Sequence, residues 1–356
     1  MQTLKHTITM KTGIISASLS LILLLSCSVH PDRPLPRGKA TPEMDQAFSA
    51  YLQAVADHKE ELHSIMVLQH GKVIEEARFA PDTAHFMMSV SKTFTATAVG
   101  FAINEGLLHL DDKITDLFPD EVPEGASDTL RRVTIRHLLT MNCGHAKDPT
   151  NAVWRGKVTD WVRHFLAWPQ PYEPGTCYCY NSLGTYMLSA AVQKVTGQKI
   201  NDDLEPRLWK PLGIAKPHWE ESPQGINCGG WGLYLRTEDM ARMGLCLLQG
   251  GQFAGKQVIP AEWVSQMSAR QVDSAPAGLT SIEVEERGYD KTTNDWLQGY
   301  GYQMWRCLHG AFRADGAAGQ YILVLPEQDA VIITTARIDN MPEELYLIWK
   351  HLLPAL

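Results

Sequence analysis

The chain has 356 residues, of which 44% are hydrophobic and 20% are charged, and its formal net charge is −8 at pH 7. This composition is typical of a soluble globular protein with a large core. The negative charge and the lack of a long Lys/Arg run argue against nucleic acid or an anionic membrane surface as the main partner.

The first 27 residues differ in composition from the rest of the chain. Lys5, His6 and Lys11 precede an apolar run that ends at Cys27. The run is too short for a comfortable transmembrane helix, and its flanks are those of an export signal. We therefore expect residues 1–27 to be a signal peptide that directs the protein to the periplasm or cell envelope.

The sequence "LLSC", which ends at Cys27, resembles a bacterial lipobox. It implies that Cys27 is lipidated and anchors the protein in a bacterial membrane; plain cleavage, with Cys27 as a bystander, is the alternative. Residues 28–41 are rich in proline and charge and would form a tether. The folded domain is then expected over residues 42–353.

Six further cysteines would share an oxidising compartment: Cys143, Cys177, Cys179, Cys228, Cys246 and Cys307. Their pairing cannot be read from the sequence, so buried free thiols and one or two disulfides both remain open. The "CYCY" segment has no second Cys or His pair at zinc-finger spacing, so no metal site is expected.

The predicted elements begin with a helix, a hairpin and a second helix. Thr41 is an N-cap before a proline, and the apolar spacing predicts a helix to about Lys59. Strand-like runs on both sides of His70 and Gly71 predict a hairpin. The next segment, "SVSKTFTATAVGFAINEG", is helical by pattern, with Gly106 as its stop.

The middle of the chain, at about 110–220, is mostly helical in pattern. Amphipathic segments such as "TIRHLLTM" and "LGTYMLSAAVQKVTG" are separated by loops rich in proline and glycine. Strand-like segments return at "AFRADG", "QYILVLP" and "AVIITTA", and a helix closes the chain. These features predict an α/β (α+β) fold, in which a sheet from both chain ends carries an inserted helical lobe. The site is expected in a cleft between the two parts.

One Ser-x-x-Lys motif, Ser89 and Lys92, lies in the stretch "MMSVSKTFTA". About one such motif is expected by chance in a chain of this length, so its placement matters more than its existence. Ser89 lies where strands give way to a helix, whose free N–H groups can stabilise an oxyanion. Lys92 follows one turn later on the same face. We predict a nucleophile and its activator; a helix-capping serine is the alternative.

Lys92 needs help to act as a base. A lysine with a pKa near 10.4 is neutral about once in a thousand molecules at pH 7.4, a cost of about 4 kcal/mol. Lys92 must therefore be partly buried beside other positive charge, or else stay charged and lower the pKa of a partner such as a tyrosine. A second group is expected from the helical lobe.

The segment "YEPGTCYCYNSLGTYMLSAAVQKVTG" supplies that group and a resemblance. It is similar to the "PGTxFxYSN" stretch of the serine β-lactamase and penicillin-binding protein superfamily, especially the class C-related hydrolases and carboxylesterases. "VTIRHLLTMNCGH", "LWKPLGI" and "GGWGLYLRTEDMARMG" extend the resemblance over most of residues 60–345. It implies a β-lactamase/DD-peptidase-like fold with an antiparallel sheet. It also implies that Tyr180 is a general base or proton relay.

The resemblance assigns further roles, with departures. The family's Tyr-x-Asn becomes Tyr180-Asn181-Ser182 here, so the amide comes one place early and the hydroxyl takes its usual position; Asn181 and Ser182 are both expected to contact substrate. The family's Lys-Thr-Gly is absent: Gly316 matches its glycine, and Ala314 stands where Lys or His would be. The N–H of Ala317, together with that of Ser89, would form the oxyanion hole.

The segment Phe312 to Gln320 resembles the subgroup of 6-aminohexanoate-dimer hydrolases and related amidases or esterases. Ala314 removes the cation that would hold a β-lactam or peptide carboxylate. Strand alternation would place Arg313 on the opposite face. Trp154, Trp231 and Trp305 are potential walls of the cleft, whereas His137 and His145 are expected to be structural.

We therefore expect an exported serine hydrolase that cleaves a small-molecule or short peptide-like ester or amide through an acyl-enzyme on Ser89. Lys92 and Tyr180 would share the proton transfers. The alternatives are a penicillin-binding D-Ala-D-Ala carboxypeptidase or β-lactamase, and a non-catalytic acylated sensor. No metal, organic cofactor or nucleic acid is implied, and the oligomeric state stays open.

Overall fold

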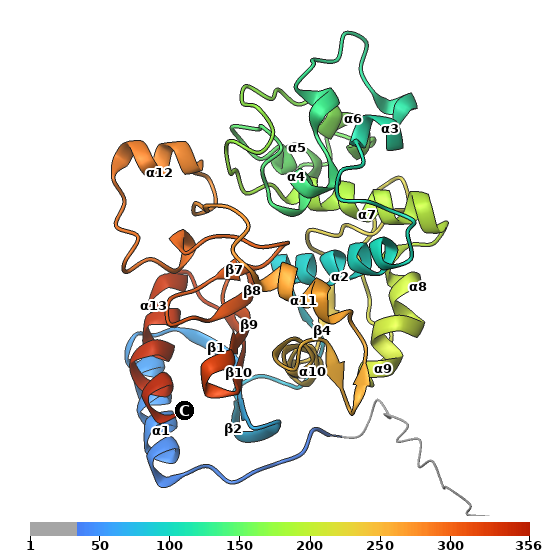
Figure 1. The fold of residues 1–356 in the computed structure, drawn as a ribbon. Helices are drawn as coiled ribbons and strands as arrows, with labels where there is room; N and C mark the ends of the chain where they lie inside the picture. Colours follow the sequence, from blue (N-terminus) through green and yellow to red (C-terminus); the bar gives the residue numbers. More distant parts are fainter. Residues whose placement is uncertain (1–33) are drawn as a thin grey trace, which may run out of the picture.

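A computed structural model describes residues 34–356 and is drawn as a ribbon in Figure 1. The predicted signal peptide, Cys27 and residues 28–33 of the predicted tether lie outside the described residues. The end of that tether is part of the domain. Leu35 is buried, and the N–H of Gly38 donates to the carbonyl of Val73 in strand β2 (Lys72–Arg78) at 2.8 Å. The predicted start at residue 42 is therefore too late.

Both ends of the chain build one six-stranded sheet, in the order β2-β1-β10-β9-β8-β7. The remaining strands are β1 (Glu61–Gln69), β7 (Trp305–Arg306), β8 (Phe312–Gly316), β9 (Gln320–Leu325) and β10 (Ala330–Arg337). All neighbouring pairs run antiparallel, and β1 joins β10 from Glu61↔Arg337 to Gln69↔Ala330. The predicted fold class and the hairpin at His70 are confirmed.

Alternate residues of β1 belong to two different cores, as the pleat requires. Ile65 and Val67 pack in a cluster with helices α1 (Pro42–Asp57) and α13 (Met341–Leu347) on one face of the sheet. Met66 and Leu68 pack on the other face, toward helix α10 (Thr237–Leu248). Figure 1 shows α1 and α13 on the side of the sheet away from α10.

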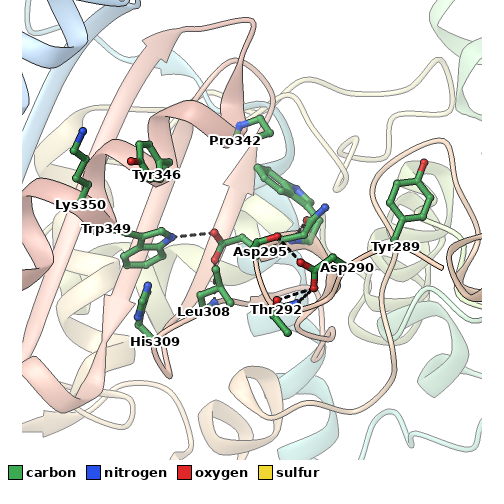
Figure 2. Close-up of a pocket in the computed structure, with 13 residues that line it drawn as sticks. Tyr289, Asp290, Thr292, Asp295, Leu308, His309, Pro342, Tyr346, Trp349 and Lys350 are labelled. Carbon is green, nitrogen blue, oxygen red and sulfur yellow. Dashed lines mark hydrogen bonds between the residues drawn. The ribbon is translucent and has the colours of Figure 1, made fainter. Parts of the chain in front are cut away.

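A cavity of about 740 Å³ lies beside α13, and Figure 2 shows its lining. Two of the lining residues are hydrogen-bonded: the Trp349 indole N–H donates to Asp295 Oδ2 at 2.9 Å. Trp349 belongs to a π-helical turn, Ile348–Leu352, that continues α13. This cavity does not include Ser89.

The helical lobe is inserted between the two halves of the sheet (Figure 1). Its helices are α3 (Ile114–Leu117), α4 (Ile135–Leu139), α5 (Thr150–Trp154), α6 (Trp161–Leu166), α7 (Ser182–Thr196), α8 (Ile200–Leu204) and α9 (Lys210–Leu212). Two helices follow the lobe, α11 (Ala261–Ser268) and α12 (Ser281–Arg287). There are also two short antiparallel strand pairs: β3 (His85–Phe86) with β4 (Tyr234–Leu235), and β5 (Gln252–Phe253) with β6 (Lys256–Gln257). Within residues 34–356, no helix has both the length and the apolar composition that crossing a bilayer requires.

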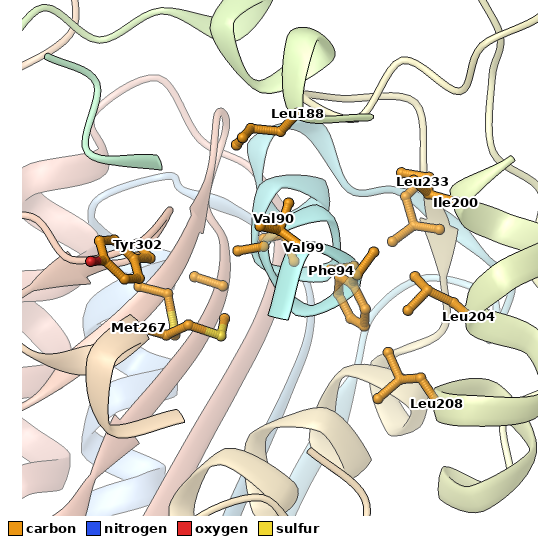
Figure 3. Close-up of a cluster of buried hydrophobic side chains, with 14 of the residues drawn as sticks. Val90, Phe94, Val99, Leu188, Ile200, Leu204, Leu208, Leu233, Met267 and Tyr302 are labelled. Atoms are coloured by element: carbon orange, nitrogen blue, oxygen red, sulfur yellow. The ribbon is translucent and has the colours of Figure 1, made fainter. Parts of the chain in front are cut away.

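Helix α2 (Ser91–Asn104) joins the sheet to the lobe and is buried from Ser91 to Ala102. Phe94 and Val99 pack among side chains from α7, α8 and α11, with Leu188, Leu204 and Met267 at its sides (Figure 3). A helix that is enclosed on all sides tolerates Thr and Val because packing decides its conformation. This packing fixes the position of the residues just before α2.

Gly100 in α2 is the place where the Trp263 indole rests. A Cβ there would lie 2.2 Å from Trp263 Cδ1, while the indole N–H donates to the Ala96 carbonyl at 2.9 Å. We expect Gly100→Ala to lower the free energy of unfolding by roughly 1–3 kcal/mol, measured by urea denaturation. In α7, a Cβ on Gly184 meets nothing closer than 3.6 Å, so Gly184→Ala is the matched control and should not destabilise. Equal losses in both variants would contradict this packing argument.

Candidate active site

Ser89 lies in a 3₁₀ turn, Met88–Val90, immediately before α2. Met88 has a φ of +48°, a left-handed conformation that is uncommon for a bulky residue and occurs often at functional sites. The turn is held on both sides: the Met87 N–H donates to the Leu233 carbonyl at 2.8 Å, and the Ser91 hydroxyl donates to the Met88 carbonyl at 2.7 Å. Ser89 is half-buried and opens onto two cavities.

Lys92 is buried and directs its ammonium group at Ser89. Its Nζ donates to Ser89 Oγ at 2.8 Å, to Ser182 Oγ at 3.0 Å and to the Gly230 carbonyl at 2.7 Å. It also lies 4.9 Å from the centre of the Tyr180 ring. The structure therefore brings together the serine, the lysine and the tyrosine that the sequence singled out.

Burial lowers the pKa of Lys92 to about 7, against the opposing effect of the carboxylates of Asp148 and Asp315. Roughly half of the lysines with such a pKa are neutral at pH 7. The sequence argument expected a neutral Lys92 to need other positive charge beside it, and that part is wrong. Burial lowers the pKa of Lys92 instead, and the nearby charges, those of Asp148 and Asp315, are negative. Asp148, which accepts from the Ser182 N–H at 3.3 Å, was not singled out by any local pattern.

Tyr180 is held in place by two aromatic neighbours. Its ring stacks on Trp305 at 5.5 Å between centroids and meets the edge of Tyr300 at 6.4 Å. Burial raises the pKa of Tyr180, and a hydrogen bond with Ser89 opposes only part of that rise. The phenol is therefore neutral at physiological pH and can donate a proton.

Asn181 differs from its expected role. Its side-chain oxygen accepts from the Gly184 N–H at 2.9 Å and caps α7, and its amide nitrogen lies 2.7 Å from His145 Nδ1. The residue is buried, so its amide supports the helix rather than facing a cavity. Ser182 contacts Lys92 instead of an open cavity. His145 has the structural role expected of it, and burial lowers its pKa to about 3.

Gly230 and Gly316 allow close approaches around this centre. A Cβ on Gly230 would lie 2.5 Å from the Ser182 carbonyl oxygen, and one on Gly316 would lie 2.6 Å from the Met87 carbonyl oxygen. The end of β8 therefore rests directly against the turn that carries Ser89. Gly316 serves this contact, and its proposed contact with substrate stays a prediction.

Ala317 lines both cavities that include Ser89. Ala314 lines neither, because its side chain is buried in the core on the α2 side of the sheet. A direct contact between Ala314 and substrate is therefore not supported by the structure. Ala314 affects substrate choice only indirectly, because an alanine at this position provides no basic side chain to the site.

A buried ion pair lies on the other face of β8. Arg313 Nε donates to Asp315 Oδ2 at 2.8 Å, and the guanidinium lies 4.6 Å from the centre of the Trp296 ring. Burial raises the pKa of Asp315, and the Arg313 charge opposes that rise. Arg313 has no exposed surface, so it does not replace the missing family lysine. The sequence indicated its face but not its partner.

The first cavity at Ser89 has a volume of about 360 Å³, and Tyr180, Trp305 and Asp315 are among its walls. The second has about 300 Å³ and is lined by Phe86, Met88, Ser89, Trp154, Glu220, Trp231 and Ala317. The three tryptophans expected at the cleft therefore line it. Among the described residues, no lysine, arginine or histidine lines either cavity.

The six described cysteines are all buried free thiols. Burial raises the pKa of Cys179 to about 12 and that of Cys228 to about 12, so neither thiol is ionised at neutral pH. They lie outside the lining of both cavities at Ser89. The open choice between thiols and disulfides is thus resolved in favour of thiols in this structure.

Residues 45–353 match the family model described as Beta-lactamase. A 6-aminohexanoate-dimer hydrolase of Paenarthrobacter ureafaciens is 27% identical over 311 residues, which cover 81% of this chain and 75% of that protein. The lovastatin esterase of Penicillium rubens is 27% identical over 156 residues, or 38% of this chain and 39% of that protein.

Two solved structures share the fold. A penicillin-binding protein homologue from Caulobacter crescentus superposes with a TM-score of 0.67 at 17% identity, over 90% of this chain and 99% of that one. A family VIII carboxylesterase gives a TM-score of 0.68 at 18% identity, over 90% of this chain and 99% of that one.

Proposed function

The chain belongs to the Beta-lactamase family, as its sequence motifs indicated, and on that premise we propose that it is a serine hydrolase of esters or amides. The observation that carries the proposal is the hydrogen bond of 2.8 Å between Lys92 Nζ and Ser89 Oγ. A buried lysine whose pKa is lowered to about 7 is a suitable base for a serine hydroxyl.

In the proposed first step, neutral Lys92 takes the proton of Ser89 as Oγ attacks the carbonyl carbon. The negative charge that forms on the carbonyl oxygen is held by the N–H groups of Ser89 and Ala317. Gly316 supports this arrangement, because it lets the end of β8 approach the Ser89 turn. The hydrogen bonds of the Met87 N–H and of the Ser91 hydroxyl hold that turn in place.

In the second step, the leaving group takes a proton and departs, which leaves an acyl group on Ser89. Tyr180 is the proposed donor, since its raised pKa keeps it protonated, and the proton that Lys92 took in the first step would then return to the Tyr180 oxygen. Water then attacks the acyl-enzyme, and the same groups transfer the protons in reverse order. Coupled proton transfer between Lys92 and Tyr180 accounts for both steps.

The cavity walls favour an ester or amide without a carboxylate near the scissile bond. Asp315, Asp339 and Glu220 line the two cavities at Ser89, and no basic side chain of residues 34–356 is part of either lining. A substrate carboxylate would lack a partner and meet like charge there. This argues against a D-Ala-D-Ala carboxypeptidase or a β-lactamase, although two relatives from Escherichia coli are named for these activities.

The proposal includes export. The charged, then apolar, N-terminal residues and Cys27 support a signal peptide and a lipid anchor, which would place the domain in the cell envelope. Mass spectrometry of the mature protein from a bacterial membrane fraction tests this: diacylglyceryl-Cys27 at the N-terminus supports it, and an intact Met1 contradicts it.

Covalent labelling tests the serine mechanism. Wild-type protein treated with a fluorophosphonate should gain one adduct that maps to Ser89, and Ser89→Ala should gain none, as read by intact mass. Penicillin should leave no stable adduct if the carboxylate argument holds. Stable labelling by penicillin would instead support the peptidase or sensor alternatives. A folded wild-type protein that reacts with neither reagent would contradict the nucleophile.

A further inference from the structure

The second cavity at Ser89 combines aromatic walls with one carboxylate. Its aromatic residues are Phe86, Trp154 and Trp231, and Glu220 is its charged residue. The Trp154 and Trp231 rings meet edge to face, with 5.5 Å between their centroids. Trp231 is buried, whereas Trp154 is 60% exposed and forms the outer wall.

The fold holds Glu220 in place in the lining of this cavity. The Tyr234 hydroxyl donates to Glu220 Oε1 at 3.2 Å, and the Tyr234 ring lies 5.2 Å from that of Phe86. The Glu220 backbone is also fixed, since its N–H donates to the Gly232 carbonyl at 2.9 Å. The carboxylate therefore needs little reorganisation to bind a ligand.

Glu220 has no cationic partner in the part of the chain that the structure describes. Within residues 34–356, no lysine, arginine or histidine forms an ion pair with it. The next residue, Glu221, differs in this respect, because it pairs with Lys199 at 2.8 Å. A half-buried carboxylate beside aromatic faces, with no internal cation, is suited to an external one.

We propose that this cavity binds an alkylammonium group, so that the substrates of Ser89 are esters or amides with a cationic amine on one side of the scissile carbonyl. The ammonium would lie against the faces of Trp154 and Trp231 and near Glu220. This inference rests on the proposed function for its catalytic part, but the binding part is independent of turnover.

Calorimetric titration of the full protein tests the binding part. Choline should bind roughly tenfold or more tightly than neohexyl alcohol, its neutral isostere in which carbon replaces nitrogen. Glu220→Gln should remove most of that difference, and Trp154→Leu should weaken choline binding. Glu221→Gln is the matched control and should leave both affinities unchanged. Equal affinities for the two ligands, or a difference that survives Glu220→Gln, would overturn the proposal.

The matched p-nitrophenyl esters of trimethylammoniobutyrate and of its neutral tert-butyl isostere test the substrate class. The wild type should prefer the cationic ester by roughly tenfold in kcat/KM, and Glu220→Gln should reduce that ratio. Preference for the neutral ester would overturn the inference while leaving the serine mechanism intact. If neither ester is cleaved and no phosphonate adduct forms, the proposed function fails, and the choline titration still decides the cation site.

Discussion

Tyr180→Phe is expected to lower kcat for an ester or amide by roughly 10²–10⁴-fold, because the variant loses the proton donor to the leaving group. The ring should stay in place, since it is fixed by stacking on Trp305 and by the edge contact with Tyr300. Steady-state kinetics on a neutral p-nitroanilide or ester measures the change. The loss should be larger for an amide, whose leaving group needs the proton more.

Tyr178→Phe provides a matched control two residues away. The Tyr178 hydroxyl is buried without a hydrogen-bond partner, so its removal should leave kcat unchanged and should not lower the free energy of unfolding. Equal rates for Tyr180→Phe and Tyr178→Phe would remove Tyr180 from the mechanism. Circular dichroism should show that Tyr180→Phe is folded, so that its lower rate reflects the lost hydroxyl and not a change in the ring contacts.

Lys92→Met should lower kcat/KM by about 10³-fold or more, because the other side chain hydrogen-bonded to Ser89, Tyr180, has a raised pKa and stays protonated, so it cannot replace Lys92 as the base. In the wild type, kcat/KM should rise with pH through about 7 as Lys92 loses its proton, and then level off. A pH profile on a neutral ester measures this rise. A rate that is independent of pH, or that falls between about pH 6 and 8, would contradict a lysine base.

Lys92→Met also has a predicted effect on stability. The folded-state pKa of about 7 lies below the usual lysine value of 10.5, so between these values the unfolded chain binds a proton that the folded one does not. The free energy of unfolding of the wild type should therefore rise with pH across this window, by up to about 1.4 kcal/mol per pH unit. Lys92→Met has no ionisable group at this position, so its free energy of unfolding, measured by urea denaturation, should lack this rise with pH. Lys194→Met, at an exposed lysine of α7, should change neither rate nor this slope.

The sequence was most informative where a residue's role depends on its near neighbours. Ser89 and Lys92 are three positions apart, and the helix that begins at Ser91 sets their relation. The hairpin at His70 and the Thr41 cap likewise depend on a few adjacent residues. Helix α12 was missed, although Thr280 and Glu283 form a capping box, because the segment has little apolar periodicity.

Roles that depend on distant residues were not predictable. The Asn181 amide suggested a substrate contact, but its partner His145 is 36 positions away and takes the side chain into the core. Asp148 and Glu220 have no motif around them, and their importance comes from the cavity and the lysine that they face. The Arg313–Asp315 pair is similar, since alternation gives the shared face but not its burial.

The family, the sheet built from both chain ends, and Ser89, Lys92 and Tyr180 as the proposed reactive group all follow from local patterns in the sequence. The sequence also shows that position 314, where the family has a basic residue, is an alanine. The pKa of Lys92 and the shape and charge of the two cavities depend on the folded arrangement and could not be predicted from the sequence. The physical reason is that desolvation depends on which atoms enclose a group: the partners of Lys92 at Ser182 and Gly230 are 90 and 138 positions away.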